Sequence, residues 1–438
     1  MKHTDIPQEF IDFLKQATTP FHAVAWMIKQ LEQAGFSKLS EKEPWQVRKG
    51  GRYYVTRNDS ALVAFTMGNQ AISDTGIHMA GAHTDSPCLK IKPLPEIFKK
   101  TYVQLGVEVY GSALLNTWFD RDLSIAGRIS WRDTQGTLKK SLIDFKNPIA
   151  ILPSLAIHFD RQANEHKSVN AQTDLPPIII GHWANSPLDF QDVLKAQIKQ
   201  ETGAANEPEA ITAHDLYFYD THPPSFTGLN REFISGGRLD NLLSCYVGLT
   251  GIMNSAPPRT NLLVLNDHEE IGSNTAAGAQ GPFLTSILNR LCPEPEHFGR
   301  AMARSIMISM DNAHGVHPNH MEKYDPNHSP VINNGPAIKI NAAHRYASDS
   351  DTISMFKQIC QDANVPFQEF VMRSDMPCGS TIGPITAAKL GVKTIDIGVP
   401  TFAMHSIREI AGTKDVEHLF KAICAYFSLT EAPFPEAI

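Results

Sequence analysis

Histidine and carboxylate residues recur in this 438-residue chain where a predicted strand ends or a predicted helix begins. One such residue would mean little, and the repetition carries the signal. The positions concerned are His83, Asp85, Asp240, Glu269, Glu270, Asp311 and His405. In open α/β sheets, function gathers at the carboxyl ends of the strands. We therefore expect these dispersed residues to meet in one site.

The residue types favour a metal centre. Two histidines with three or more carboxylates suit a borderline metal such as zinc or manganese. Two neighbouring metal ions need a bridging carboxylate, with one histidine and one further carboxylate for each ion. The candidates that fill this requirement are His83, Asp240, Glu270, Asp311 and His405. The set fits two divalent ions of zinc, manganese or cobalt.

Two more carboxylates accompany the candidate ligands. Glu269 precedes Glu270 in the sequence, and a glutamate beside an activated water can take its proton and return it to a leaving amine. Asp85 lies two residues after His83 and could accept the other ring N–H of that histidine. Glu269 and Asp85 are therefore the predicted catalytic residues.

Each of these residues also has a purely structural explanation. Asp240 and Asp311 could be helix caps, because aspartate favours that position. Glu269 and Glu270 could be a solvated surface pair. A single histidine such as His83 is more often structural than a ligand. The repeated placement at strand ends favours the metal site over these alternatives.

The elements that must position these residues follow two patterns. From about residue 236, predicted strands alternate with helices, which implies a mainly parallel sheet covered by helices on both faces. Residues 96–235 show period-two alternation instead, typical of an antiparallel sheet with one exposed face. The alternating stretches are Tyr102–Tyr110, Ser124–Trp131 and Leu138–Phe145. We predict an α/β fold whose catalytic domain comprises 1–95 and 236–438, with 96–235 inserted as a β-rich lobe.

Charge, hydropathy and cysteine pattern limit the partners and the compartment that we expect for this protein. The formal net charge of -7 argues against a nucleic-acid partner, which would need a basic face. The sequence has no apolar run long enough for a membrane span. The 6 cysteines are scattered without a C-x-x-C pair, which is typical of a reducing compartment. We expect a cytoplasmic protein that binds neither nucleic acid nor membrane.

Ordered motifs along almost the whole chain resemble the aspartyl aminopeptidase family of cocatalytic metalloexopeptidases. They are Gly81–Pro87, Asn116–Leu123, Ser235–Asn241, Asp267–Ser273, Ser309–His314, Pro377–Pro384 and Ala403–Glu409. The resemblance implies a zinc exopeptidase-like fold and a tetrahedral homo-dodecamer, with the inserted lobe making dimer contacts. It also implies the ligand assignment. His83 and Asp311 would hold one metal, Glu270 and His405 the other, and Asp240 would bridge.

The same resemblance implies a substrate, a peptide with a free N-terminus and an acidic first residue. Lys339 would meet the acidic side chain, and Arg345 and Tyr346 could complete the pocket wall. His158 of the inserted lobe would reach the active site of a neighbouring subunit. Without the resemblance, a lysine on a strand is usually solvated or placed at a sheet edge.

The implied mechanism is hydrolysis by a metal-bound water, with Glu269 as general base and the substrate amine bound to one metal. Three alternatives stay open. The enzyme could prefer neutral N-terminal residues. It could be another dinuclear hydrolase, such as a deacylase or phosphoesterase, that needs no free amine. The chain could also be a catalytically silent assembly scaffold.

Overall fold

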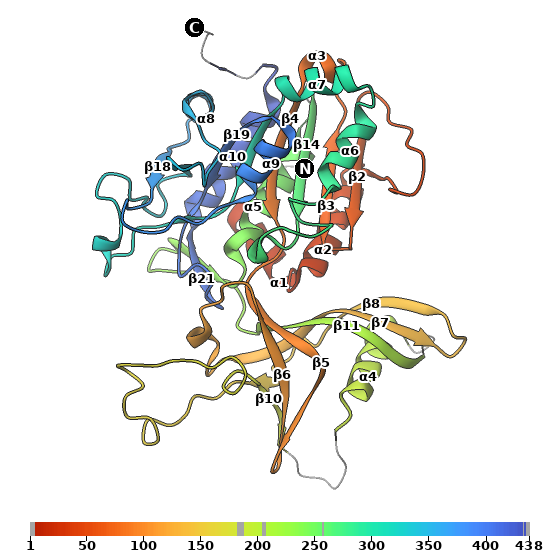
Figure 1. The fold of residues 1–438 in the computed structure, drawn as a ribbon, viewed down its shortest axis with the longest axis vertical. Coiled ribbons are helices and arrows are strands. Elements are labelled where there is room, and N and C mark those ends of the chain that lie inside the picture. The colour runs from red at the N-terminus through yellow and green to blue at the C-terminus, as the bar shows by residue number, and fades with distance from the viewer. Residues whose placement is uncertain (1–4, 182–187, 204–206, 256–257, 432, 435–438) are drawn as a thin grey trace. The chain divides into compact units, whose positions relative to one another are not determined.

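The computed structural model describes residues 5–181, 188–203, 207–255, 258–431 and 433–434. It divides into two compact units, shown as a ribbon in Figure 1. The first unit comprises Met1–Asp85, Pro224–Met404 and Glu409–Ile438. The second comprises Ser86–Pro223 and His405–Arg408.

The first unit is built on a nine-stranded sheet. In spatial order its strands are β1 (Ser37–Lys38), β2 (Arg52–Arg57), β3 (Ala61–Thr66), β14 (Thr260–Asn266), β4 (Ile77–His83), β15 (Ile306–Met310), β19 (Lys393–Gly398), β17 (Ala337–Ile340) and β18 (Gln368–Val371). The central neighbours β14, β4, β15 and β19 are parallel to one another. Strand β3 is antiparallel to β14, and β17 is antiparallel to β19. The predicted mainly parallel sheet is therefore confirmed at its centre.

Helices cover both faces of this sheet. Successive residues of a strand face opposite sides, so each central strand contributes side chains to two apolar cores. On β4, Ala80 packs in one apolar core and Met79 in the other. The core around Ala80 includes residues of α1 (Ile6–Gln16), α2 (Pro20–Gln33), α5 (Leu239–Asn254), α8 (Ser350–Asp362) and α10 (Thr413–Ser428). The core around Met79 includes residues of α6 (Phe283–Leu291), α7 (Pro295–Arg304) and α9 (Ile382–Leu390). Every strand at the centre of the sheet is thus buried on both sides.

Local signals place several helix starts. Helix α2 begins with such a signal, since the Thr19 hydroxyl accepts from His22 N–H and Pro20 is the first helical residue. Asp349 and Thr352 form a capping box at the start of α8. A smaller sheet in this unit contains β12 (Ser225–Thr227), β13 (Phe233–Gly236), β21 (Glu409–Gly412), β20 (Pro400–Phe402) and β16 (Ala313–His314).

The second unit holds a seven-stranded sheet whose described pairs are antiparallel. Its strands, in spatial order, are β11 (Pro208–Asp220), β5 (Cys88–Lys99), β6 (Tyr102–Tyr110), β10 (Ile178–Gly181), β9 (Ala150–Ile151), β7 (Asp122–Asp133) and β8 (Leu138–Asp144). Helix α4 (Phe190–Thr202) contributes Phe190, Leu194 and Ile198 to the apolar core of this unit. The expected β-rich insertion is therefore present.

The limits of this unit differ from the expected 96–235. Strand β5 pairs with β6 and β11, so the unit already begins at Ser86. Strand β13 pairs with β12 and β21 in the first unit, so the second unit ends at Pro223 before its short return at His405–Arg408. A role of this unit in dimerisation stays a prediction. Within the described part of the chain, no helix combines the length and the apolar character needed to cross a bilayer.

Candidate metal centre

Three of the predicted ligand segments meet because their strands are parallel. Strand β4 ends at His83, which is in register with Asn266 at the end of β14. Strand β15 lies on the other side of β4 and ends directly before Asp311. The carboxyl ends of neighbouring parallel strands lie at one edge of the sheet. The segments that follow these strands therefore converge around His83.

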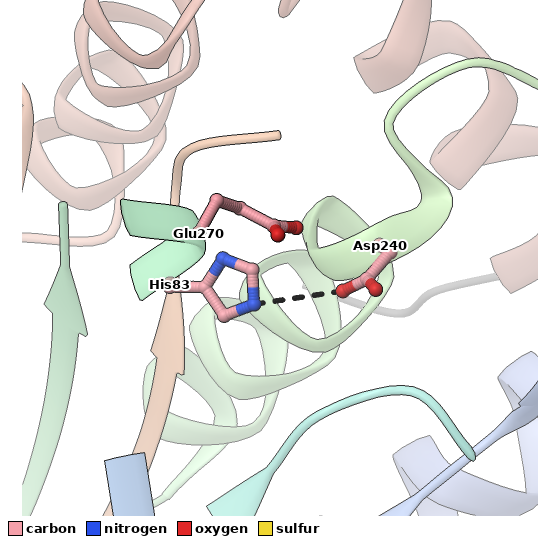
Figure 2. A group of neighbouring side chains, drawn as sticks. All are labelled: His83, Asp240 and Glu270. Atoms are coloured by element: carbon pink, nitrogen blue, oxygen red, sulfur yellow. Dashed lines mark ion pairs between the residues drawn. The ribbon is translucent and has the colours of Figure 1, made fainter. Parts of the chain in front are cut away.

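The imidazole of His83 is the centre of a tight polar cluster. Its Nε2 lies 3.5 Å from Asp240 Oδ1 and 3.4 Å from Asp311 Oδ1. One donor atom from each of His83, Asp240 and Glu270 lies within 4.8 Å of the other two (Figure 2). Glu269 Oε2 is 4.0 Å from the same nitrogen. The structure thus brings together four of the five predicted ligands and the predicted base.

Asp240 is held in place by the start of α5 and by a second carboxylate. Its backbone N–H donates to Glu409 Oε2 at 2.9 Å, and Glu409 is almost fully buried. The next side chain, Asn241, donates to Met310 O at 2.8 Å, which ties α5 to the end of β15. The Asp240–Asn241 peptide bond is cis. The role of Glu409 is not visible in the sequence, since a glutamate at the start of a short strand carries no pattern of its own.

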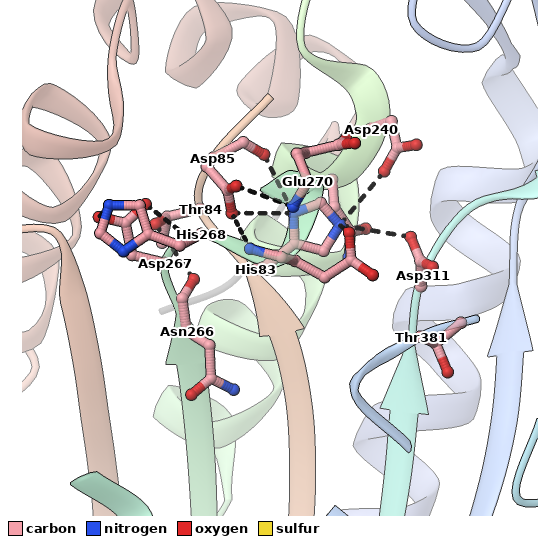
Figure 3. Close-up of polar contacts among 12 residues, drawn as sticks. His83, Thr84, Asp85, Asp240, Asn266, Asp267, His268, Glu270, Asp311 and Thr381 are labelled. Carbon is pink, nitrogen blue, oxygen red and sulfur yellow. Dashed lines mark hydrogen bonds and ion pairs between the residues drawn. The ribbon is translucent and has the colours of Figure 1, made fainter. Parts of the chain in front are cut away.

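Asp85 contacts both His83 and the backbone of Glu269 and Glu270. Its carboxylate accepts from Glu269 N–H and from Glu270 N–H, each at 3.1 Å. The Nδ1 atom of His83 lies 3.0 Å from Asp85 O and 3.4 Å from Asp85 Oδ1 (Figure 3). A proton on Nδ1 would be shared with Asp85, which leaves the Nε2 lone pair facing the carboxylate cluster. This geometry suits Asp85 to orient His83 and to hold the turn that carries Glu269, while its catalytic role stays a prediction.

Burial and like charges dominate the electrostatics. Burial raises the pKa of Glu269 to about 8, with the carboxylates of Asp311 and Asp240 adding to the effect and His83 opposing it. Burial together with Asp240 raises the pKa of Glu270 well above its usual value. Burial would also raise the pKa of Asp311, but the nearby cations Lys339 and His83 hold it well below its usual range. The cluster therefore holds more carboxylates than its own cations could neutralise if all of them were ionised.

The residues fit divalent metal ions. Asp85, Asp240, Glu269, Glu270 and Asp311 bring five carboxylates, while the described contacts supply one imidazole and one ammonium, those of His83 and Lys339. Buried carboxylates without compensating charge are costly, and bound dications would supply that charge. Imidazole nitrogen and carboxylate oxygen are donors that zinc binds. Elsewhere in the described chain, no other group of three such donors is close enough to hold an ion.

Lys339 is buried beside this cluster and is not a solvated strand lysine. It lies on β17 with 2% of its surface exposed, and its Nζ is 3.3 Å from Asp311 Oδ2. The same Nζ lies 5.4 Å from the centre of the Tyr346 ring, which is also buried. Arg345 is exposed and donates from Nε to Gly379 O at 3.4 Å. The structure thus brings Lys339 and Tyr346 together next to a predicted ligand.

Two predicted residues belong to the second unit. His405 has a positive φ of 68°, and its Nδ1 lies 3.1 Å from Ser112 O. Its backbone carbonyl accepts from Leu114 N–H at 2.9 Å. His158 is exposed in the segment that follows β9. Their roles as a metal ligand and as a substrate contact stay predictions.

An α/β sheet that gathers histidine and carboxylates at its carboxyl edge is typical of a metal-dependent enzyme. Comparison with known proteins gives the family. Residues 13–427 match the model of the aminopeptidase I zinc metalloprotease (M18) family. The chain is 52% identical to a probable M18 family aminopeptidase 2 of Ectopseudomonas mendocina, over 98% of this chain and 99% of that protein. The chain therefore belongs to the M18 family of zinc aminopeptidases, which confirms the enzyme class.

Solved structures agree with this assignment. The structure of Ape4 in complex with Nbr1 superposes with a TM-score of 0.93 at 35% identity, covering 96% of this chain and 85% of that one. The S. cerevisiae mApe1 dodecamer superposes with a TM-score of 0.83 at 29% identity, covering 97% of this chain and 96% of that one. Both coverages extend over nearly all of this chain, so the inserted β-rich unit is part of the shared fold.

Proposed function

We propose that this M18 enzyme is a dinuclear zinc aminopeptidase that prefers aspartate or glutamate at the N-terminus of its peptide substrates. The observation that carries the acidic preference is the buried ammonium of Lys339, 3.3 Å from Asp311 Oδ2. A buried cation at the side of the catalytic cluster is the group that an acidic side chain requires for recognition.

The residues that would hold two zinc ions are His83, Asp240, Glu270, Asp311 and His405. Asp240 is the proposed bridge, since its Oδ1 lies 3.5 Å from His83 Nε2 and it belongs to one group of donor atoms with His83 and Glu270 (Figure 2). When bound, the ions would polarise the scissile carbonyl and make a water molecule acidic enough to attack at neutral pH. The substrate's free amine would complete the binding, which restricts cleavage to the first peptide bond.

Glu269 is the proposed base. Its Oε2 lies 4.0 Å from His83 Nε2 among the proposed ligands, where a carboxylate could accept a proton from water and return it to the leaving amine. Asp85 holds the backbone of Glu269 and Glu270 through two 3.1 Å hydrogen bonds. The carboxylate that moves the proton and the carboxylate that binds metal are therefore positioned by one anchor.

Lys339 and Tyr346 form the proposed specificity pocket. The ammonium would bind the acidic side chain of the first substrate residue, and the Tyr346 ring limits the space beside it. Arg345 forms the outer wall through its contact with Gly379. A pocket with a buried cation favours an acidic first residue, since an apolar side chain would offer the ammonium no further partner beside Asp311.

We also propose that the protein assembles as a homo-dodecamer in which His158 completes the site of a neighbouring subunit. The support is an exposed apolar segment around this histidine. Leu155, Ile157 and Phe159 are 65%, 47% and 82% exposed. Such a run on a surface is typical of an interface. The related S. cerevisiae mApe1 forms a dodecamer. Light scattering tests this directly, and Phe159→Asp should give smaller particles.

The decisive experiment for the reaction is turnover of a peptide series by zinc-loaded protein. The peptides carry Asp, Glu, Leu or Ala at the N-terminus, each with a free and an acetylated amine. The proposal requires strong turnover of the Asp and Glu peptides that disappears when the amine is blocked. A preference for Leu or Ala would keep the aminopeptidase and remove the acidic pocket. Cleavage of blocked peptides, or no cleavage at all, would contradict the proposal.

A further inference from the structure

Asp396 is a buried carboxylate outside the metal cluster that the proposed mechanism does not use. It lies on β19, and its side chain has no measurable exposure. Its Oδ1 accepts from the Thr381 hydroxyl and its Oδ2 from Ala347 N–H, both at 2.6 Å. Both donors are neutral groups. Burial raises the pKa of Asp396, as expected for a carboxylate without a direct cation partner.

The two donors belong to different loops. Ala347 follows Tyr346 in the loop between β17 and α8, and Thr381 directly precedes α9. A third contact joins the first loop to the same strand residue, since Asp396 N–H donates to the Ser348 hydroxyl at 3.0 Å. Asp396 is therefore the shared anchor of both loops.

The loops are also joined to each other above this anchor. Arg345 Nε donates to Gly379 O at 3.4 Å, and the Ser380 hydroxyl donates to Arg345 O at 3.2 Å. Tyr346, between these contacts and the anchor, lies 5.4 Å from Lys339 Nζ and 6.4 Å from the Phe370 ring. The loops that Asp396 ties together are thus the walls of the proposed specificity pocket.

The sequence makes room for this carboxylate. Gly383, in the first turn of α9, approaches Asp396 so closely that a Cβ there would lie 2.3 Å from Oδ2 and 2.4 Å from Oδ1. The Thr381 hydroxyl accepts from Gly383 N–H at 3.2 Å, which directs its own proton towards Asp396. Glycine at residue 383 and a hydroxyl at residue 381 are therefore matched to an aspartate at residue 396.

Stability alone does not account for such a residue. A buried carboxylate bonded to neutral donors contributes less to folding than a well-packed apolar side chain of similar size. Buried ionisable groups of this kind cluster at functional sites, where they fix geometry. We propose that Asp396 is a positioning residue that holds the Arg345–Ser348 and Gly379–Thr381 loops, and so sets the width of the pocket that selects the first substrate residue. This inference rests on the proposed function of Lys339 and Tyr346.

The test compares Thr381→Val, Thr381→Ser and Asp396→Asn in the full-length, zinc-loaded protein. Thr381→Val removes the hydroxyl that donates to Asp396 at nearly constant volume, whereas Thr381→Ser keeps the hydroxyl. Loss of one hydrogen bond to a charged acceptor should raise KM for an N-terminal Asp peptide about tenfold, with kcat changed less than about twofold. Selectivity for Asp over Leu should fall with it, and Thr381→Ser should restore both to the wild-type values.

A second measurement needs neither substrate nor turnover. Hydrogen–deuterium exchange of peptides covering residues 341–349 and 376–383 should become faster in Thr381→Val and Asp396→Asn, but not in Thr381→Ser. Unchanged exchange in both loops, or a fall in kcat with KM and selectivity unchanged, would overturn the inference. If the wild-type protein cleaves no peptide, the proposed function fails, while the exchange data still decide whether Asp396 anchors the loops.

Discussion

Strand β4 carries a histidine near each end, and the two ends of this strand behave in opposite ways. His78 and His83 are both buried, with 0% and 1% of their surfaces exposed. Burial and the nearby Arg259 lower the pKa of His78 to about 4. Burial would lower the pKa of His83 as well, but the hydrogen-bonding carboxylates of Asp240, Asp311 and Asp85 raise it well above its usual value.

The difference lies in what the fold places at each end. The His78 ring stacks on the ring of Tyr426 of α10, with 5.2 Å between the ring centroids. His83 stands at the carboxyl edge, where Asp85 of its own segment and carboxylates from three other segments lie near its ring. His78 is therefore a buried packing residue, whereas His83 is a candidate metal ligand. The sheet topology determines the role of each histidine. Each of the following predictions alters the surroundings of His83 or of His78.

The largest effect is expected from Glu269→Gln. The amide cannot take a proton from water, so kcat for an N-terminal Asp peptide should fall roughly a thousandfold. Zinc content, measured by atomic absorption, should stay at the wild-type level, because the backbone contact to Asp85 is kept. Glu296→Gln, on the exposed start of α7, is the matched control and should keep full activity. Activity within tenfold of the wild type would remove Glu269 from the role of base.

Asp85→Asn should have the next largest effect. The wild-type carboxylate accepts two backbone N–H groups, and an asparagine can accept only one of them without turning its own NH₂ towards the other. Loss of this kind of supporting contact costs 10- to 100-fold in activity or metal affinity, so about 50-fold is expected here. Steady-state kinetics and zinc titration measure it. Asp74→Asn is the control, since Asp74 pairs with Arg300 at the surface. If the variant kept the wild-type zinc affinity and kcat, the two hydrogen bonds from the Glu269 and Glu270 N–H groups to Asp85 would be dispensable.

Much of this edge of the sheet could be predicted from the sequence. Apolar runs such as Asn261–Asn266 are continuous, so the strand and the charged turn after it are both visible. Motif resemblance then supplied roles that spacing alone leaves open. The parallel order of β14, β4 and β15 explains why residues far apart in sequence meet at one edge.

Other parts were missed for physical reasons. Strand β5 is interrupted by Lys90, Lys92, Pro93 and Pro95, so its apolar pattern is weak, and its pairing with β6 and β11 is long-range. The limits of the inserted unit were misplaced for the same reason. Glu409 and Asp396 carry no local signal, because their roles depend on loops that arrive from elsewhere in the chain. The pairing of Lys339 with Asp311 is likewise invisible before folding.

Lys339→Met changes the charge around His83 without substituting any of the candidate ligands. Removing a cation 3.3 Å from Asp311 Oδ2 should make the site bind zinc more tightly, by about tenfold. The preference for Asp over Leu peptides should fall by a similar factor, because the acidic side chain loses its partner. Competition with a chromophoric chelator measures the zinc affinity, and the ratio of kcat/KM for Asp and Leu peptides measures the preference. Lys393→Met, which removes an exposed lysine paired with Asp351, is the control. Unchanged zinc affinity would show that Lys339 does not act on the metal site.

His78→Phe tests the other end of β4 and should have the smallest effect, confined to acid pH. The pKa of His78 is about 4 in the folded protein against 6.5 for an unperturbed histidine, so the unfolded state takes up the proton first as pH falls. Between pH 7 and pH 5.5 this should cost the wild type about 1 kcal/mol of stability that the phenylalanine variant does not lose. Phenylalanine keeps a ring against Tyr426 and cannot titrate.

Urea or thermal unfolding of both proteins at the two pH values measures the difference, with the zinc concentration held constant. The exposed His297→Phe serves as the matched control and should follow the wild type at both pH values, since His297 is half exposed and its ring is solvated. If wild type and His78→Phe lose equal stability on acidification, His78 is protonated in the folded state. Both histidines would then be charged in the folded protein, and the pKa contrast between the two ends of β4 would disappear.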